Sequence, residues 1–163
     1  WIRRSLVSED LRIRLYNAFV LPVLCYNCAT WAPTKQQLSR IEAFHRKQLR
    51  ALIGIVFPNR IRNERLYERT GAVPLGIIIL RARWRLFGHV LRLPADSPPS
   101  LAMGAYFAEP RPAGWRGRPR HTLPTLLQDD AKRIGLSLSS KVDLEAFRAL
   151  AADRSGWVGI CAR

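Results

Sequence analysis

Residues 74–92 read PLGIIILRARWRLFGHVLR and carry two periodic patterns at once. Apolar residues recur every three or four positions, which places them on one side of an α-helix: Ile77, Leu80, Trp84, Phe87 and Leu91. Basic residues follow the same spacing on a second side, here called the cationic ridge: Arg81, Arg85, His89 and Arg92. The stretch therefore predicts a helix that buries one face and exposes positive charge on another, and Pro74 suits its first turn.

The first helix is predicted between Ser8, a suitable N-cap, and about Trp31, with a kink at Pro22. Residues 15–34 of this region carry no charge. Because this run also contains Pro22, Pro33 and small polar side chains, it favours a buried, kinked helix over a membrane span. We therefore expect no membrane partner.

Two more helices are predicted before residue 74. Thr34 and Gln37 form a capping box for a helix that ends at Gly54, and a shorter helix is expected from Asn59 to Thr70. The four helices are expected to pack around a single core of large apolar side chains: Phe19, Leu38, Leu49, Trp84 and Phe87.

The composition changes at Pro94. Proline and glycine are abundant between residues 94 and 123, which predicts an irregular loop that includes a short extended piece around residues 101–107. Beyond it, one helix is expected to end at Gly135 and another to begin at Asp143. The sequence thus predicts an all-α protein in three parts, namely a helical bundle at 1–93, a basic loop at 94–123 and a helical buttress at 124–163.

The charge balance indicates the class of partner. The 163 residues contain 27 Lys and Arg against 12 Asp and Glu, which gives a formal net charge of +15. A field of this size attracts polyanions, and nucleic acid is the commonest of them, with an anionic membrane surface as the other candidate. Since 48% of the residues are hydrophobic, the chain can bury a core, and a disordered basic tail is excluded.

The cysteines do not predict a cofactor site. Cys25 and Cys28 have the Cys-x-x-Cys spacing, but a structural zinc site needs two more ligands, and the three histidines are scattered at positions 45, 89 and 121. We expect buried thiols and no cofactor. With three cysteines and no secretory signal, an intracellular location is expected.

Asp129 and Asp130 form an adjacent acidic pair. The pair lies inside a helical pattern, which favours a solvated helix face or a partner for a neighbouring arginine. A metal-dependent nuclease that uses both carboxylates is the enzymatic alternative.

Positive charge interleaved with aromatic residues is the remaining functional signal, because arginines neutralise phosphates and exposed rings stack on bases. The candidate nucleic-acid-binding residues are the cationic ridge together with Lys47, Arg50, Trp115, Arg116, Arg118 and Arg120. For His89, packing at the edge of the core is the other interpretation, and for Trp115 it is docking onto the domain. A protein-interaction or scaffolding domain, whose charge only keeps it soluble, is the alternative from another class.

Several segments in a fixed order also carry a family resemblance. They are residues 22–31 (PVLCYNCATW), 50–55 (RALIGI), 61–63 (IRN), 83–92 (RWRLFGHVLR) and 117–120 (GRPR), followed by Asp153, Arg154 and Trp157. In this combination the chain resembles the region downstream of the palm in non-LTR (LINE-type) retrotransposon reverse transcriptases.

The resemblance implies a mostly helical thumb and C-terminal region that helps to hold template RNA and primer DNA. The palm and fingers of the same polyprotein would be its partners, and the polymerase's catalytic aspartates would lie before Trp1. The chain alone is therefore not expected to be an enzyme. The expected location is nuclear or cytoplasmic, as a ribonucleoprotein.

Overall fold

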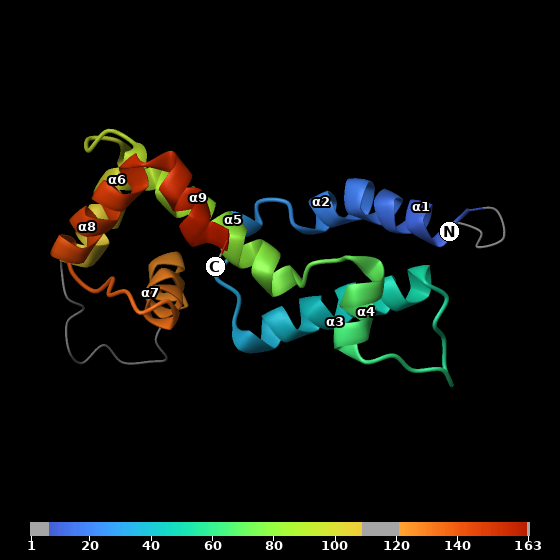
Figure 1. The fold of residues 1–163 in the computed structure, drawn as a ribbon. Helices are drawn as coiled ribbons and strands as arrows, with labels where there is room; N and C mark the ends of the chain where they lie inside the picture. Colours follow the sequence, from blue (N-terminus) through green and yellow to red (C-terminus); the bar gives the residue numbers. More distant parts are fainter. Residues whose placement is uncertain (1–6, 109–120, 163) are drawn as a thin grey trace. The chain divides into compact units, whose positions relative to one another are not determined.

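The computed structural model describes residues 7–108 and 121–162, and all regular secondary structure in that part of the chain is helical (Figure 1). The all-α prediction is therefore confirmed. The chain divides into two compact units, of which the first contains Trp1–Cys28 and Pro33–Ile79 and the second contains Ala29–Ala32 and Leu80–Arg163. The division falls within one helix, α5, which spans Leu75–Arg92.

In the first unit, the segment predicted as one kinked helix is divided further. Helix α1 (Glu9–Leu15) starts at the expected N-cap Ser8, continues as a π-helical stretch over Tyr16–Val20 and then as α2 (Leu21–Leu24). The helix does not reach Trp31, because a turn separates α2 from a short 3-10 helix at Cys28–Thr30. Pro22 has no N–H for the carbonyl four residues back, and the N–H before it, that of Leu21, donates to the Tyr16 carbonyl in π-helical register.

The prediction that Phe19 belongs to the core is wrong. Its side chain is 68% exposed, whereas Ile13 and Tyr16 are buried on the same segment. The Tyr16 hydroxyl lies 2.8 Å from Nδ1 of the buried His45, so a polar pair joins the start of the π-helical stretch to α3. Because Tyr16 takes that position, the stripe that contains Phe19 faces outward.

Helix α3 (Lys35–Leu52) agrees closely with the prediction. The Thr34 hydroxyl accepts a hydrogen bond from the Gln37 N–H, the Gln37 side chain accepts one from the Thr34 N–H, and Gly54 has a φ of 80° after the helix end. Leu49 is fully buried, and Leu38 is only half-buried. Local capping signals therefore place this helix correctly.

Helix α4 (Asn63–Thr70) begins four residues later than the predicted Asn59. The Arg50 guanidinium donates to the carbonyl of Ile61 at 3.4 Å and to the Asn63 side chain at 2.7 Å. Arg50 on α3 thus contacts the residue before the N-cap Arg62 and the first residue of α4.

Helix α5 confirms most of the predicted apolar stripe. Trp84, Phe87 and Leu91 are buried, while Ile77 is 42% exposed. Ile79 and Leu75 fill the buried positions near the start of the helix instead. Steps of four residues from Leu75 through Ile79 also lead to Arg83, which is buried as well.

The extended piece predicted around residues 101–107 is instead helix α6 (Pro98–Ala108). Both prolines, at positions 98 and 99, stand in the first turn, where their missing N–H groups would have no intrahelical acceptor. The Ser97 carbonyl accepts the N–H of Leu101 as the helix begins. Prolines that indicated a loop therefore start a helix. Residues 94–97 and 121–122 of the predicted loop are not helical, and residues 109–120 lie outside the described residues.

Three helices follow, not the two predicted: α7 (Leu123–Arg133), α8 (Lys141–Ala152) and α9 (Arg154–Ala162). Gly135, with a φ of 77°, follows the end of α7 as predicted, and Asp143 lies in the first turn of α8 behind its N-cap Ser140. The extra helix, α9, begins after only one intervening residue, Asp153.

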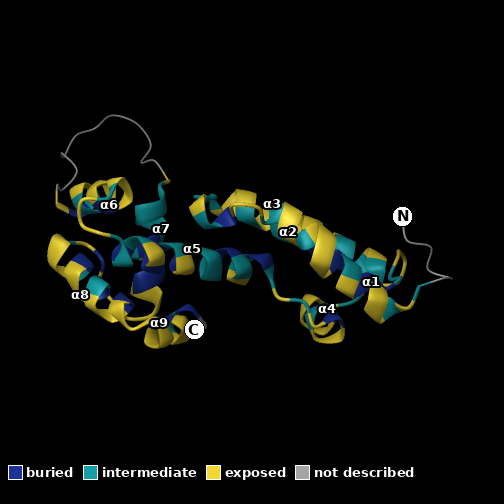
Figure 2. Cartoon of the chain, turned by 90° about the horizontal axis from the view of Figure 1, so that it is seen from above, coloured by how far each residue is buried: buried dark blue, intermediate teal, exposed yellow. Residues whose placement is uncertain are grey.

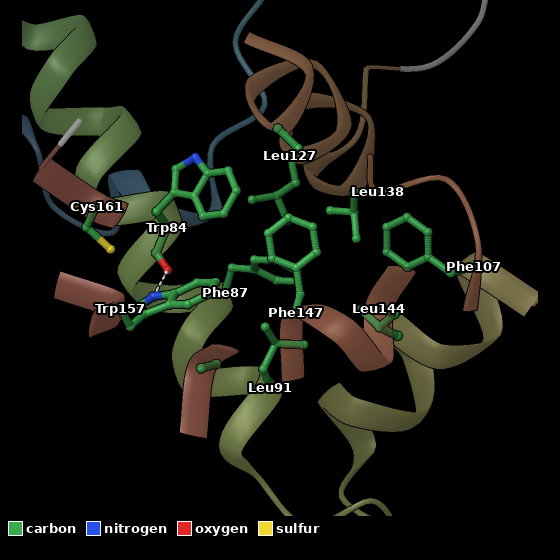
Figure 3. Packing of buried hydrophobic residues seen from close by; sticks show 12 residues of the cluster. Trp84, Phe87, Leu91, Phe107, Leu127, Leu138, Leu144, Phe147, Trp157 and Cys161 are labelled. Carbon is green, nitrogen blue, oxygen red and sulfur yellow. Dashed lines mark hydrogen bonds between the residues drawn. The ribbon is translucent and has the colours of Figure 1, made fainter. Parts of the chain in front are cut away.

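Each unit has its own core, so the prediction of a single core is wrong. Leu49 belongs to the first, with Ile13, Tyr16, Ile53 and Leu66. Trp84 and Phe87 belong to the second, where they pack on Phe147 and Trp157 (Figure 3). In the second unit, exposed residues cover the outer sides of α8 and α9 (Figure 2).

Candidate nucleic-acid interface

Three members of the cationic ridge line one pocket in the second unit. Arg85 and His89 are exposed on α5, and Arg92 is half-buried at its end. The fourth member, Arg81, is half-buried and is not among the lining residues. The ridge predicted from spacing therefore continues into a concave site at the C-terminal half of α5.

Helix α9 supplies the other wall of this pocket. The lining residues are Arg85, His89, Arg92, Leu93, Arg154, Trp157, Val158 and Cys161, which we call the cationic pocket, and its volume is about 490 Å³. Arg154 was not among the predicted site residues. Its segment carries little net charge, but Arg154 lies beside Asp153 and near Trp157 in the last of the motifs that carry the family resemblance.

A buried contact between the two helices shapes the pocket. The indole N–H of Trp157 donates to the Trp84 carbonyl at 3.0 Å, and both rings are buried (Figure 3). Gly88 lies beneath this ring, and a β-carbon there would overlap the Trp157 indole. Since only glycine permits this close approach, residue 88 and the Trp157 hydrogen bond together hold α9 against α5.

The lining of the pocket carries a net positive charge, because it contains three arginines and no acidic residue. The nearest acidic residue in the sequence, Asp153, caps α9 by accepting bonds from the N–H groups of Ser155 and Gly156 and from the Ser155 hydroxyl. These bonds lower the pKa of the Asp153 carboxyl. Arg92 is oriented by a 3.1 Å bond from Nη1 to the Ala151 carbonyl.

Cys161 also lines the pocket, and its side chain is buried. Burial raises the pKa of its thiol, while the positive charges of Arg85 and Arg92 act in the opposite direction. The thiol is therefore protonated at neutral pH, and it does not cancel the charge of the arginines.

Arg83 has a structural role that the sequence reasoning missed. Its Nη1 donates to Oδ2 of Asp130 at 2.6 Å, and both side chains are more than nine-tenths buried. The signal was its position four residues after Ile79 and four before Phe87, on the buried side of α5. Asp130 is thus the partner of an arginine in the core, while its neighbour Asp129 is exposed. The two carboxylates therefore lie in different environments.

Lys47 and Arg50 lie on α3 in the first unit, whereas the lining residues of the cationic pocket all belong to the second unit. Lys47 is exposed, whereas Nη2 of Arg50 makes the two hydrogen bonds that hold the start of α4. The predicted residues Trp115, Arg116, Arg118 and Arg120 lie outside the described residues.

The Cys25 thiol is half-buried, and burial together with the neighbouring Cys28 raises its pKa to about 11. Within residues 7–108 and 121–162, no group of three or more His, Cys, Asp or Glu side chains is placed to hold a metal ion. Across the same ranges, no helix combines the length and the apolar character that crossing a membrane requires.

Comparisons with known proteins add no family assignment. No family model matches the chain, and neither curated proteins nor solved structures give a match.

Proposed function

We propose that this chain is a non-catalytic nucleic-acid-binding domain that holds its ligand through arginine–phosphate contacts. The cationic pocket is the observation that carries the proposal, since side chains from α5 and α9 converge there without a carboxylate among them. Guanidinium groups bind phosphate oxygens with charge-assisted hydrogen bonds, and such contacts confer little sequence preference.

The motif order described above extends this proposal to a biological setting. The chain would be the thumb-like C-terminal part of a LINE-type reverse transcriptase, and it would grip the duplex of RNA template and DNA primer. The palm and fingers of the same polyprotein would supply the chemistry. Support for this setting comes from the resemblance of the motifs, and support for phosphate binding comes from the pocket.

The test is the salt dependence of binding to an RNA–DNA hybrid, measured by fluorescence anisotropy. Each phosphate contact releases counterions, so Arg85→Gln and Arg154→Gln are each expected to weaken binding and to flatten the logarithmic salt dependence by roughly one unit. Lys132→Gln is the matched control, because it removes one exposed charge of the second unit outside the pocket.

Saturable binding with these changes confined to the pocket variants supports the proposal. If both pocket variants retain the affinity and slope of the unchanged chain, the pocket is not a phosphate-binding site. Equal losses in all three variants would show that only the total charge matters.

A scaffolding domain remains the second candidate because of one observation in the first unit. Phe19, Val23 and Tyr26 are 68%, 76% and 80% exposed within the uncharged run, and exposed apolar groups of this kind are typical of protein contacts. This alternative predicts only weak, non-saturating association with the hybrid at physiological salt.

A further inference from the structure

The shape of the cationic pocket limits which phosphates can fill it. A duplex backbone presents its phosphates in a row along a surface, whereas Arg85, Arg92 and Arg154 line one open concave site of about 490 Å³ on two helices. A single backbone phosphate inside a continuous strand has a neighbouring nucleotide on both sides. The end of a strand has a neighbour on one side only, so it enters a concave site more easily.

The charge of the pocket points in the same direction. Three arginines and one histidine line it, and no carboxylate among the lining residues offsets them. An internal phosphodiester carries one negative charge, while a phosphate monoester carries about 1.5 to 2 negative charges at neutral pH and has three strong acceptor oxygens. The monoester is the better match in both charge and number of acceptors.

The rest of the wall suits the group attached to such a phosphate. Leu93 is half-buried and Val158 is exposed, and both line the pocket beside the basic groups. Sites for small ligands of this volume combine apolar walls with a few convergent polar groups. A terminal sugar can therefore contact the aliphatic side chains while its phosphate meets the arginines.

We propose that the cationic pocket binds a terminal phosphate monoester of a nucleic-acid strand. This inference rests on the proposed function and narrows it, because a strand end, rather than an internal phosphate, is the preferred ligand. Arg85 and Arg154 hold the phosphate oxygens, and Arg92, fixed by the Ala151 carbonyl, contributes its remaining N–H groups.

The experiment compares three RNA–DNA hybrids of one sequence that carry a 5′-phosphate, a 3′-phosphate or hydroxyl groups at all ends. We expect one of the phosphorylated hybrids to bind about tenfold more tightly than the hydroxyl-ended one, as a single additional charge-assisted hydrogen bond would give. The arm that gains affinity identifies which end is recognised. Arg85→Gln and Arg154→Gln should abolish this preference, and Lys132→Gln should retain it.

The results separate this inference from the proposed function. If all three hybrids bind equally well, the monoester inference is overturned while nucleic-acid binding stands. A preference that survives in both pocket variants also overturns it, since the recognition would then lie elsewhere. If none of the hybrids binds, the proposed function fails, and calorimetry with a nucleoside 5′-monophosphate and a nucleoside 3′-monophosphate decides the inference alone, because absence of heat with both refutes it.

Discussion

The interiors of the two units are built differently. In the first unit, the Glu42 carboxylate accepts hydrogen bonds from the Gly76 N–H at 2.6 Å and the Tyr67 hydroxyl at 3.0 Å, and the nearby His45 contacts Tyr16. In the second unit, aromatic rings fill the centre: Trp84, Phe87, Phe147 and Trp157 have centroids 5.7 to 6.4 Å apart.

This difference shows that two kinds of interaction specify neighbouring parts of one chain. Hydrogen bonds in the first unit fix which helix faces meet, and they depend on the protonation state of their members. Contacts between rings in the second unit depend on the buried area and the shape of the side chains. In the described core of that unit, the charged component is one buried ion pair, Arg83 with Asp130. The two units should therefore respond differently to the loss of a charge and to pH.

The largest effect is expected from Asp130→Ala in the second unit. The change leaves the guanidinium of Arg83 buried without its carboxylate, and Nε of Arg83 already has no hydrogen-bond partner. Breaking a buried pair in this way costs about 3 to 5 kcal/mol of unfolding free energy. Denaturant titration followed by tryptophan fluorescence measures it, because Trp31, Trp84 and Trp157, the described tryptophans, all belong to this unit.

The double variant Arg83→Met with Asp130→Leu sharpens the result. It removes both charges and keeps apolar volume, so most of the lost stability should return. If Asp130→Ala alone costs less than about 1 kcal/mol, the pair contributes as little as an exposed one, and the contrast between the two interiors is weaker than described.

The features that the sequence predicted depend on interactions within about one turn of helix. The features that depend on contacts between residues far apart in the sequence were not predicted. The caps at Thr34 and Gly54 and the buried stripe around Trp84 follow from local chemistry, and the structure confirms them. The division into two cores depends on pairs such as Trp84 with Trp157, which are 73 residues apart. No local pattern indicates such a pairing.

The candidate site shows the same limit. The spacing on α5 predicted that Arg85, His89 and Arg92 share a side, and they line one pocket. Arg154 was missed because the charge of its segment, averaged over many residues, is small, whereas only the fold brings that single arginine to α5.

An intermediate effect is expected from pH in the first unit. Burial lowers the pKa of His45 from its usual 6.5, and Arg46 acts in the same direction, while Glu42 and the Val73 carbonyl oppose the shift. The folded state therefore binds fewer protons here than the unfolded state. The contribution of the neutral His45 to the free energy of unfolding is complete above pH 6.5. It is lost as the pH falls toward the lowered pKa, by up to about 1.4 kcal/mol per pH unit.

Hydrogen exchange between pH 7 and 5 measures this loss unit by unit. Amides of α1 and α3 should lose protection on acidification after correction for intrinsic rates, and amides of α8 should not. His45→Gln should remove the pH dependence of α1 and α3. Equal loss of protection in both units would contradict the assignment of the pH response to His45.

The smallest effects are expected at the helix caps, where the units can be compared directly. Thr34→Ala should destabilise the first unit by about 1 kcal/mol, because the Gln37 N–H loses its acceptor. Ser140→Ala should cost the second unit less. There the Asp143 carboxylate still accepts hydrogen bonds from the N–H groups of Ser139 and Ser140. Hydrogen bonds from this serine loop lower the pKa of Asp143 to about 2, so it stays charged near the helix N-terminus. Denaturant titration of both variants and of Thr34→Ser, which keeps the hydroxyl, checks the order, and a larger loss for Ser140→Ala would show that the carboxylate does not compensate.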